Sequence, residues 1–87
     1  MEKEIKEINL PDWFDGEVYT EGSEVTNPYS GHSCYLTAKE LSMYDFIKGS
    51  EFLLNSGSED SSLSKMFYDG LWWFKDSSPA SYMTLLD

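Results

Sequence analysis

The spacing of apolar residues divides the chain into an irregular first third and a helical remainder. Between residues 63 and 74, apolar or small side chains recur every three or four positions, which places them on one helix face. They are Leu63, Met66, Phe67, Gly70, Leu71 and Phe74. A second stripe runs from Ala38 to about Asn55, where an Asn-Ser-Gly-Ser sequence ends it. The pattern predicts two long helices joined by a polar, acidic connector.

Local signals fix where the helices begin. Thr37 and Glu40 have the spacing of a capping box, and Leu36 and Leu41 have that of a hydrophobic staple. Ser78 before Pro79 predicts a third, short helix, because Ser caps helices and Pro is favoured at the first helical position. In that helix we expect Tyr82, Met83 and Leu86 to face inward.

Each of the two predicted long helices contains a glycine, Gly49 in the first and Gly70 in the second. A glycine inside a helix costs about 1 kcal/mol relative to alanine. At Gly49 we therefore expect either a break in the helix or the close approach of another element. Gly70 lies within the apolar stripe, and both glycines together favour close packing of the two helix axes.

The first third predicts strands and turns. Glu17–Thr20 and Glu24–Asn27 are β-prone, and Val25–Asn27 is expected to pair with His32–Leu36. The intervening turn has Pro28 at an early position and Gly31 in a left-handed conformation.

Before these strands, the charged residues 1–9 predict a frayed arm, and residues 10–16 predict a bend that carries Trp13 and Phe14. The whole pattern predicts an α+β fold: an N-terminal bend and a small antiparallel β-hairpin packed on two longer α-helices and a short C-terminal helix. At 87 residues, the chain is expected to be a single small domain over residues 1–87.

Charge narrows the classes of partner. The chain has sixteen acidic residues, six lysines and no arginine, and its net charge is −10. Direct binding of nucleic acid or of an anionic membrane is therefore not expected, because proteins bind such negatively charged surfaces through Lys and Arg side chains. The N-terminus lacks the basic start and apolar run of a signal peptide, and no apolar run approaches the roughly 20 residues of a membrane span. We expect a cytoplasmic protein.

No pattern of catalytic residues emerges. His32 and Cys34 share a strand face, but side chains two positions apart lie parallel and no orienting Asn or Asp is evident. One His and one Cys do not supply a zinc site, and Asp12, Asp15 and Glu17 lack the spacing of a calcium loop. We expect no enzyme activity, no cofactor and no metal.

The aromatic residues, 16% of the chain, are the other candidates for function. Trp13, Phe14, Trp72 and Trp73 are the possible interaction anchors. For the pair Trp13 and Phe14, packing on the domain's own core is the stronger expectation. Trp72 and Trp73 widen the apolar stripe and predict a helix buried on more than one side. The aromatic content leaves both a monomer and a homodimer open.

Short turn and aromatic signatures lie at residues 11–16, 27–31, 36–49 with the sequence Tyr-Asp-Phe-Ile, 72–74 and 82–87. With these signatures the chain resembles small acidic proteins of tailed bacteriophages, particularly those of marine bacteria and cyanobacteria. That group has no known activity to transfer. The resemblance implies a phage source and, with it, a place in the host cytoplasm. For the function, we expect a small acidic accessory protein that acts by protein–protein interaction with an unknown target.

Two versions of that interaction remain open. In one, the acidic surface imitates nucleic acid and inhibits a host nucleic-acid-binding enzyme. In the other, the aromatic residues form an apolar interface, as in a virion structural or assembly component.

Overall fold

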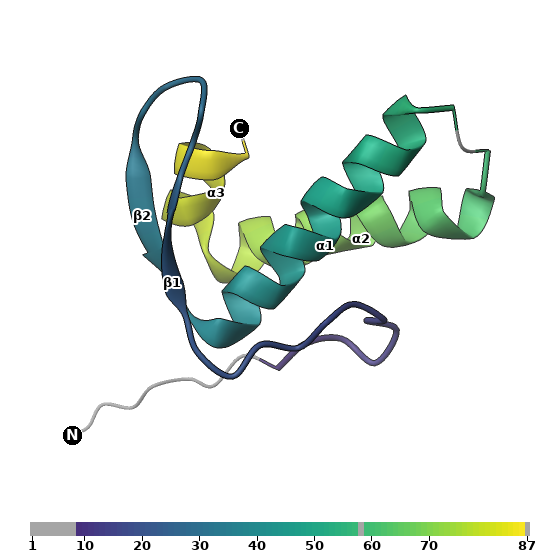
Figure 1. The fold of residues 1–87 in the computed structure, drawn as a ribbon. Helices are drawn as coiled ribbons and strands as arrows, with labels where there is room; N and C mark the ends of the chain where they lie inside the picture. The colour runs from purple at the N-terminus through teal and green to yellow at the C-terminus, as the bar shows by residue number, and fades with distance from the viewer. Residues whose placement is uncertain (1–8, 58, 87) are drawn as a thin grey trace.

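The computed structural model describes residues 9–57 and 59–86. Along the chain lie β1 (Ser23–Thr26), β2 (Ser33–Leu36), α1 (Ala38–Asn55), α2 (Ser61–Ser77) and α3 (Pro79–Leu85). The helices α1 and α2 pack side by side, and α3 lies between the hairpin and α2 (Figure 1). The predicted α+β fold is confirmed. The predicted arm over residues 1–9 lies, except for Asn9, outside the described residues.

The antiparallel hairpin forms where its turn residues predict it. Val25 pairs with Cys34 and Thr26 with Ser33. The turn closes through the Gly31 N–H, which donates to the Asn27 carbonyl at 2.8 Å, and Gly31 has a φ of 80°. A side chain would be strained in that conformation, so glycine is the residue that permits this turn.

The expected strand over residues 17–20 does not form. The N–H of Tyr19 donates to the Ser42 hydroxyl of α1 at 2.9 Å, and the Tyr19 phenol donates to the Asp45 carboxylate. This segment therefore runs along α1, and its hydrogen bonds go to side chains of that helix.

Helix α1 starts with the predicted capping box. The Thr37 hydroxyl accepts from the Glu40 N–H at 3.3 Å, and a Glu40 carboxylate oxygen accepts from the Thr37 N–H at 2.8 Å. Leu36, just before the cap, is fully buried. The core forms where α1, α2, α3 and β2 meet, and its buried apolar residues are Leu36, Met43, Ile47, Phe74 and Leu85.

Only one of the two helical glycines marks a close contact. A β-carbon at Gly70 would lie 3.1 Å from Met43 Sδ and 3.4 Å from Ile47 Cγ1, so α1 packs tightly on α2 at this point. A β-carbon at Gly49 would have no neighbour within 4 Å, and α1 continues past it to Asn55. The expected break or close approach at Gly49 is therefore wrong, because Gly49 lies on the exposed side of the helix.

Helix α3 begins at Pro79 as predicted, but its inward face differs. Tyr82 and Leu86 pack against the core, whereas Met83 is 67% exposed and Leu85 is buried instead. Residues 78, 82 and 85 share one helix face, and this face is turned toward the core. Position 83 lies about 100° away from 82, so Met83 is exposed rather than facing inward as predicted. Ser78 occupies the N-cap position without a capping bond from its side chain.

The N-terminal bend packs on α1 and α2. The Phe46 ring lies 5.8 Å from Trp13 and 5.5 Å from Phe14, measured between ring centroids. Trp13 also approaches α2, because its Cη2 would lie 3.6 Å from a β-carbon at Gly70. The bend is thereby fastened to both long helices.

Candidate functional site

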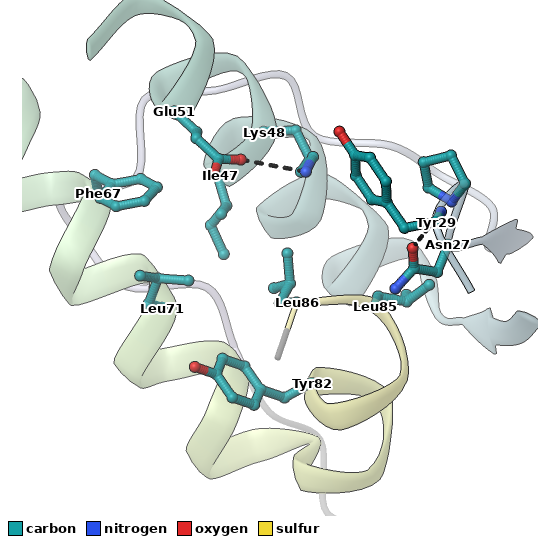
Figure 2. Close-up of a pocket in the computed structure, with 11 residues that line it drawn as sticks. Asn27, Tyr29, Ile47, Lys48, Glu51, Phe67, Leu71, Tyr82, Leu85 and Leu86 are labelled. Carbon is teal, nitrogen blue, oxygen red and sulfur yellow. Dashed lines mark hydrogen bonds and ion pairs between the residues drawn. The ribbon is translucent and has the colours of Figure 1, made fainter. Parts of the chain in front are cut away.

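A pocket of about 260 Å³ opens where α1, α2, α3 and the hairpin turn meet. Ile47, Phe67 and Leu71 contribute apolar walls from the two long helices, and Tyr82 and Leu86 contribute walls from the end of the chain (Figure 2). Its other lining residues are Asn27, Pro28, Tyr29, Lys48, Glu51 and Leu85. The lining is therefore mixed, with apolar side chains from all three helices and polar side chains from the hairpin turn and α1.

The hairpin turn is held at the rim by one amide side chain. Asn27 Nδ2 donates to the Thr84 carbonyl at 3.0 Å, and Asn27 Oδ1 accepts from the Tyr29 N–H at 2.8 Å. Tyr29 itself is 94% exposed. On the α1 side, Lys48 forms an ion pair with Glu51 at 3.2 Å. The rim thus carries a neutralised charge pair and an exposed aromatic ring.

Two exposed aromatic residues of α2 extend the site beyond the pocket. Trp72 is 68% exposed and Tyr68 is 59% exposed. Trp72 precedes the buried Phe74 by two positions, about 200° around the helix, so it points away from the core. Tyr68 makes an edge contact with Phe67, a pocket wall, at 5.1 Å between ring centroids.

The Lys75 side chain contacts both Trp72 and a wall of the pocket. Its ammonium lies 5.8 Å from the centroid of the Trp72 ring and 5.6 Å from that of Tyr82, a pocket wall. These are cation–π distances. We call the pocket together with Tyr68, Trp72 and Lys75 the α2–α3 face.

Charge is distributed unevenly around this face. Helix α2 carries two lysines and two aspartates, so its net charge is zero, and Lys65 pairs with Asp69 at 2.9 Å. Residues 9–57 carry eight acidic residues and two lysines, a net charge of −6. The exposed aromatic residues of α2 therefore lie on a neutral helix of a strongly acidic protein.

The four predicted anchors differ in their exposure to solvent. Trp13 and Phe14 are half-buried against Phe46, so the expectation that they pack on their own domain agrees with the structure. Trp73 is half-buried, and its Nε1 donates to the Asn9 carbonyl at 3.1 Å. Trp72 is the one anchor of the four that lies exposed. The prediction that Trp72 and Trp73 together bury a second side of α2 is wrong for Trp72.

Acidic side chains gather in the segment that runs from the bend to β1, residues 12–24. Asp12, Asp15, Glu17, Glu21 and Glu24 are all exposed. Residues 9–38 contain no lysine or arginine, so nothing within this stretch neutralises them. The segment forms a second candidate surface, distinct from the α2–α3 face.

Beside this acidic segment, one tyrosine titrates unusually. The hydrogen bond that the Tyr19 phenol donates to the Asp45 carboxylate raises the pKa of Tyr19 from 10.0 to about 12. Desolvation and the negative charges of Asp45 and Glu17 add to the shift. The pair fastens the acidic segment to α1.

The hairpin residues with reactive side chains lie apart from the pocket lining. His32 is exposed at the hairpin rim and Cys34 is half-buried in β2. Within residues 9–57 and 59–86, no group of three or more His, Cys, Asp or Glu side chains is placed to hold a metal ion. No helix in this described part is long and apolar enough to cross a membrane.

Sequence reasoning missed the pocket and several residues around it. Tyr68 and Lys75 lie four and three positions from Trp72, a spacing that puts all three on one helix face and could have singled them out. Tyr29 gave no such signal, because its place at the rim depends on the bond between Asn27 and Thr84, 57 positions apart.

Comparison of the chain with protein-family models, curated proteins and solved structures gives no match.

Proposed function

We propose that this protein is a non-enzymatic accessory protein that acts by binding another protein through the α2–α3 face. The observation that carries the proposal is the exposure of Trp72 on a helix that has no net charge and that lines a pocket with Phe67 and Leu71. Exposed Trp and Tyr residues next to a cavity, with charged groups excluded or paired, are typical of interface centres.

The pocket supports a protein partner better than a small metabolite. Its volume of about 260 Å³ lies below the roughly 300–1,000 Å³ of most small-molecule sites. Two of the charged groups that line it, Lys48 and Glu51, already pair with each other. An apolar side chain of a partner needs no further polar group inside the pocket.

A crosslinking experiment tests this proposal. A photoreactive amino acid at position 68 should crosslink to a partner in a lysate of the source cells, and Trp72→Ala should abolish the product. The same amino acid at position 15, in the acidic segment, serves as the comparison. Crosslinks from position 15 alone, unaffected by Trp72→Ala, would refute binding through the α2–α3 face.

The acidic segment favours a second candidate function, imitation of nucleic acid. Its five exposed carboxylates have no basic neighbour within residues 9–38. In this alternative they occupy the basic site of a host nucleic-acid-binding enzyme and inhibit it. Such binding should weaken steeply in salt, because the Debye length falls from about 10 Å at 0.1 M to about 3 Å at 1 M. An interface at Trp72 should weaken less, because its apolar contacts are not screened by salt.

The phage-type origin stays a prediction that rests on the resemblance. A partner that proves to be a virion component would favour the structural or assembly role. A soluble host enzyme captured through the acidic segment would favour inhibition.

A further inference from the structure

We infer that the partner of the α2–α3 face is a basic amphipathic segment, with one large apolar side chain for the pocket and Lys or Arg side chains for the surrounding aromatic rings. This inference rests on the proposed function and adds the chemistry of the partner. The size of the pocket, the position of Lys75 and the charge of the chain support it.

The pocket volume suits one bulky side chain. An apolar cavity of about 150 Å³ holds one benzene ring, so about 260 Å³ accommodates a Leu, Phe or Trp side chain with some backbone. Ile47, Phe67 and Leu71 present apolar walls to the pocket, as Figure 2 shows, and an anchor can pack against them. The anchor is therefore expected to be apolar.

The position of Lys75 shows that the aromatic rings beside the pocket bind a cation. Its ammonium lies over both Trp72 and Tyr82, at 5.8 and 5.6 Å from the ring centroids. The negative faces of Trp and Tyr rings attract cations. Because Trp72 and Tyr68 remain mostly exposed, they can take further cations from a partner.

The net charge of the whole chain, rather than that of the face, agrees with a basic partner. Near the face, Lys48 pairs with Glu51 and Lys65 pairs with Asp69. Lys75 is therefore the described cation that would repel a basic partner at this face. At longer range, the net charge of −10 attracts basic segments and repels acidic ones. An acidic partner would have to overcome this repulsion, and so would a second copy of the chain.

A selection from random peptides reports the partner chemistry that the face prefers. The full chain is immobilised and probed with a displayed peptide library. Peptides that bind the protein but not its Leu86→Trp variant, in which the larger ring fills the pocket, are sequenced. Circular dichroism verifies that this variant is folded. Tyr29→Ala provides a second test of whether the peptides bind at the pocket. Because Tyr29 is 94% exposed, this substitution carries little risk to folding.

We expect the enriched peptides to share a large apolar residue flanked by Lys or Arg. With a selected peptide, Lys75→Met should tighten binding about fivefold, because it frees both rings for the partner's cation. Lys65→Met is the matched control: it removes the same charge from α2 at a position paired with Asp69, and should have the smaller effect.

The inference would be overturned by an enrichment of acidic peptides, by a weaker rather than tighter complex with Lys75→Met, or by no enrichment at all. Enriched apolar peptides without a basic bias would also refute it, while leaving a protein-binding α2–α3 face intact. Peptides that bind Leu86→Trp and Trp72→Ala as well as the native chain would count against the proposed function itself.

Discussion

Ser78 donates a hydrogen bond from its hydroxyl to the carboxylate of Glu40. The other oxygen of that carboxylate accepts from the Thr37 N–H at the start of α1. Glu40 therefore completes the cap of one helix and holds the junction between α2 and α3 at the same time. Ser78 sits at the N-cap of α3, and its hydroxyl is used for this tertiary bond rather than for capping.

Removal of the Glu40 side chain should destabilise the protein more than removal of an ordinary capping side chain does. Glu40→Ala is expected to lower the free energy of unfolding by about 2 kcal/mol, since both a cap and a charge-assisted hydrogen bond are lost. Ser78→Ala should cost about 1 kcal/mol, because it removes one bond and leaves the capping box in place. Urea unfolding measures both. Equal losses for the two variants would contradict the double role of Glu40.

The two helical glycines should respond in opposite ways. Gly49→Ala should raise the free energy of unfolding by about 0.5–1 kcal/mol, because nothing lies near the added methyl and alanine favours helix. Gly70→Val should lower it by about 1–3 kcal/mol through overpacking against Met43 and Ile47. Thermal unfolding of both variants provides the measurement. A stabilised Gly70→Val protein would mean that the interface between α1 and α2 is loose.

Stability should fall at alkaline pH as Tyr19 ionises. The pKa of Tyr19 is about 12 when folded, above its ordinary value of 10.0, so ionisation is harder in the folded state. The contribution of the bond to Asp45 is therefore complete below about pH 10 and is lost as the pH rises through about 12. Ultraviolet absorbance of phenolate, compared between the native chain and Tyr19→Phe, isolates this titration.

Asp45→Asn is the control for that titration. It removes the negative charge and weakens the main cause of the shift, so the pKa of Tyr19 should move back toward 10.0. A Tyr19 titration that is unchanged by Asp45→Asn would show that this hydrogen bond does not set it.

The pocket should depend on the Asn27 side chain. Asn27→Asp keeps an acceptor for the Tyr29 N–H but loses the donor to the Thr84 carbonyl, and it places two oxygen acceptors against each other. We expect a loss of about 1–3 kcal/mol in the free energy of unfolding. Amide hydrogen exchange should rise in the turn and at the end of α3. Unchanged exchange at both places would contradict the role of Asn27.

Local patterns in the sequence were enough to place the helices and the turn. The capping box at Thr37, the Ser78-Pro79 start and the Gly31 turn each depend on residues within a few positions of one another. Such features carry their own hydrogen bonds or backbone restrictions, so they can be recognised without the tertiary structure.

Features that depend on distant partners could not be predicted. The run from Glu17 is β-prone, yet Tyr19 bonds to α1 and no strand forms. The exposed Met83 and the buried Leu85 reflect the direction in which α3 meets its neighbours. The pocket joins the hairpin turn to the end of the chain through Asn27 and Thr84, which no local pattern connects.

The exposure of Trp72 leads to a prediction that separates binding from folding. Trp72→Ala removes a ring that is 68% exposed, so the free energy of unfolding should change by no more than about 0.5 kcal/mol. Trp13→Ala removes a ring packed on Phe46 and near Gly70, and should cost about 3 kcal/mol. For binding the order should reverse: Trp72→Ala should abolish partner crosslinking from position 68, whereas Trp13→Ala should retain it at temperatures where that variant stays folded. Urea unfolding and crosslinking yield, measured on the same preparations, provide both values. If Trp72→Ala binds normally, or if both variants lose binding only in proportion to their unfolding, Trp72 is not an anchor and the acidic segment becomes the remaining candidate surface.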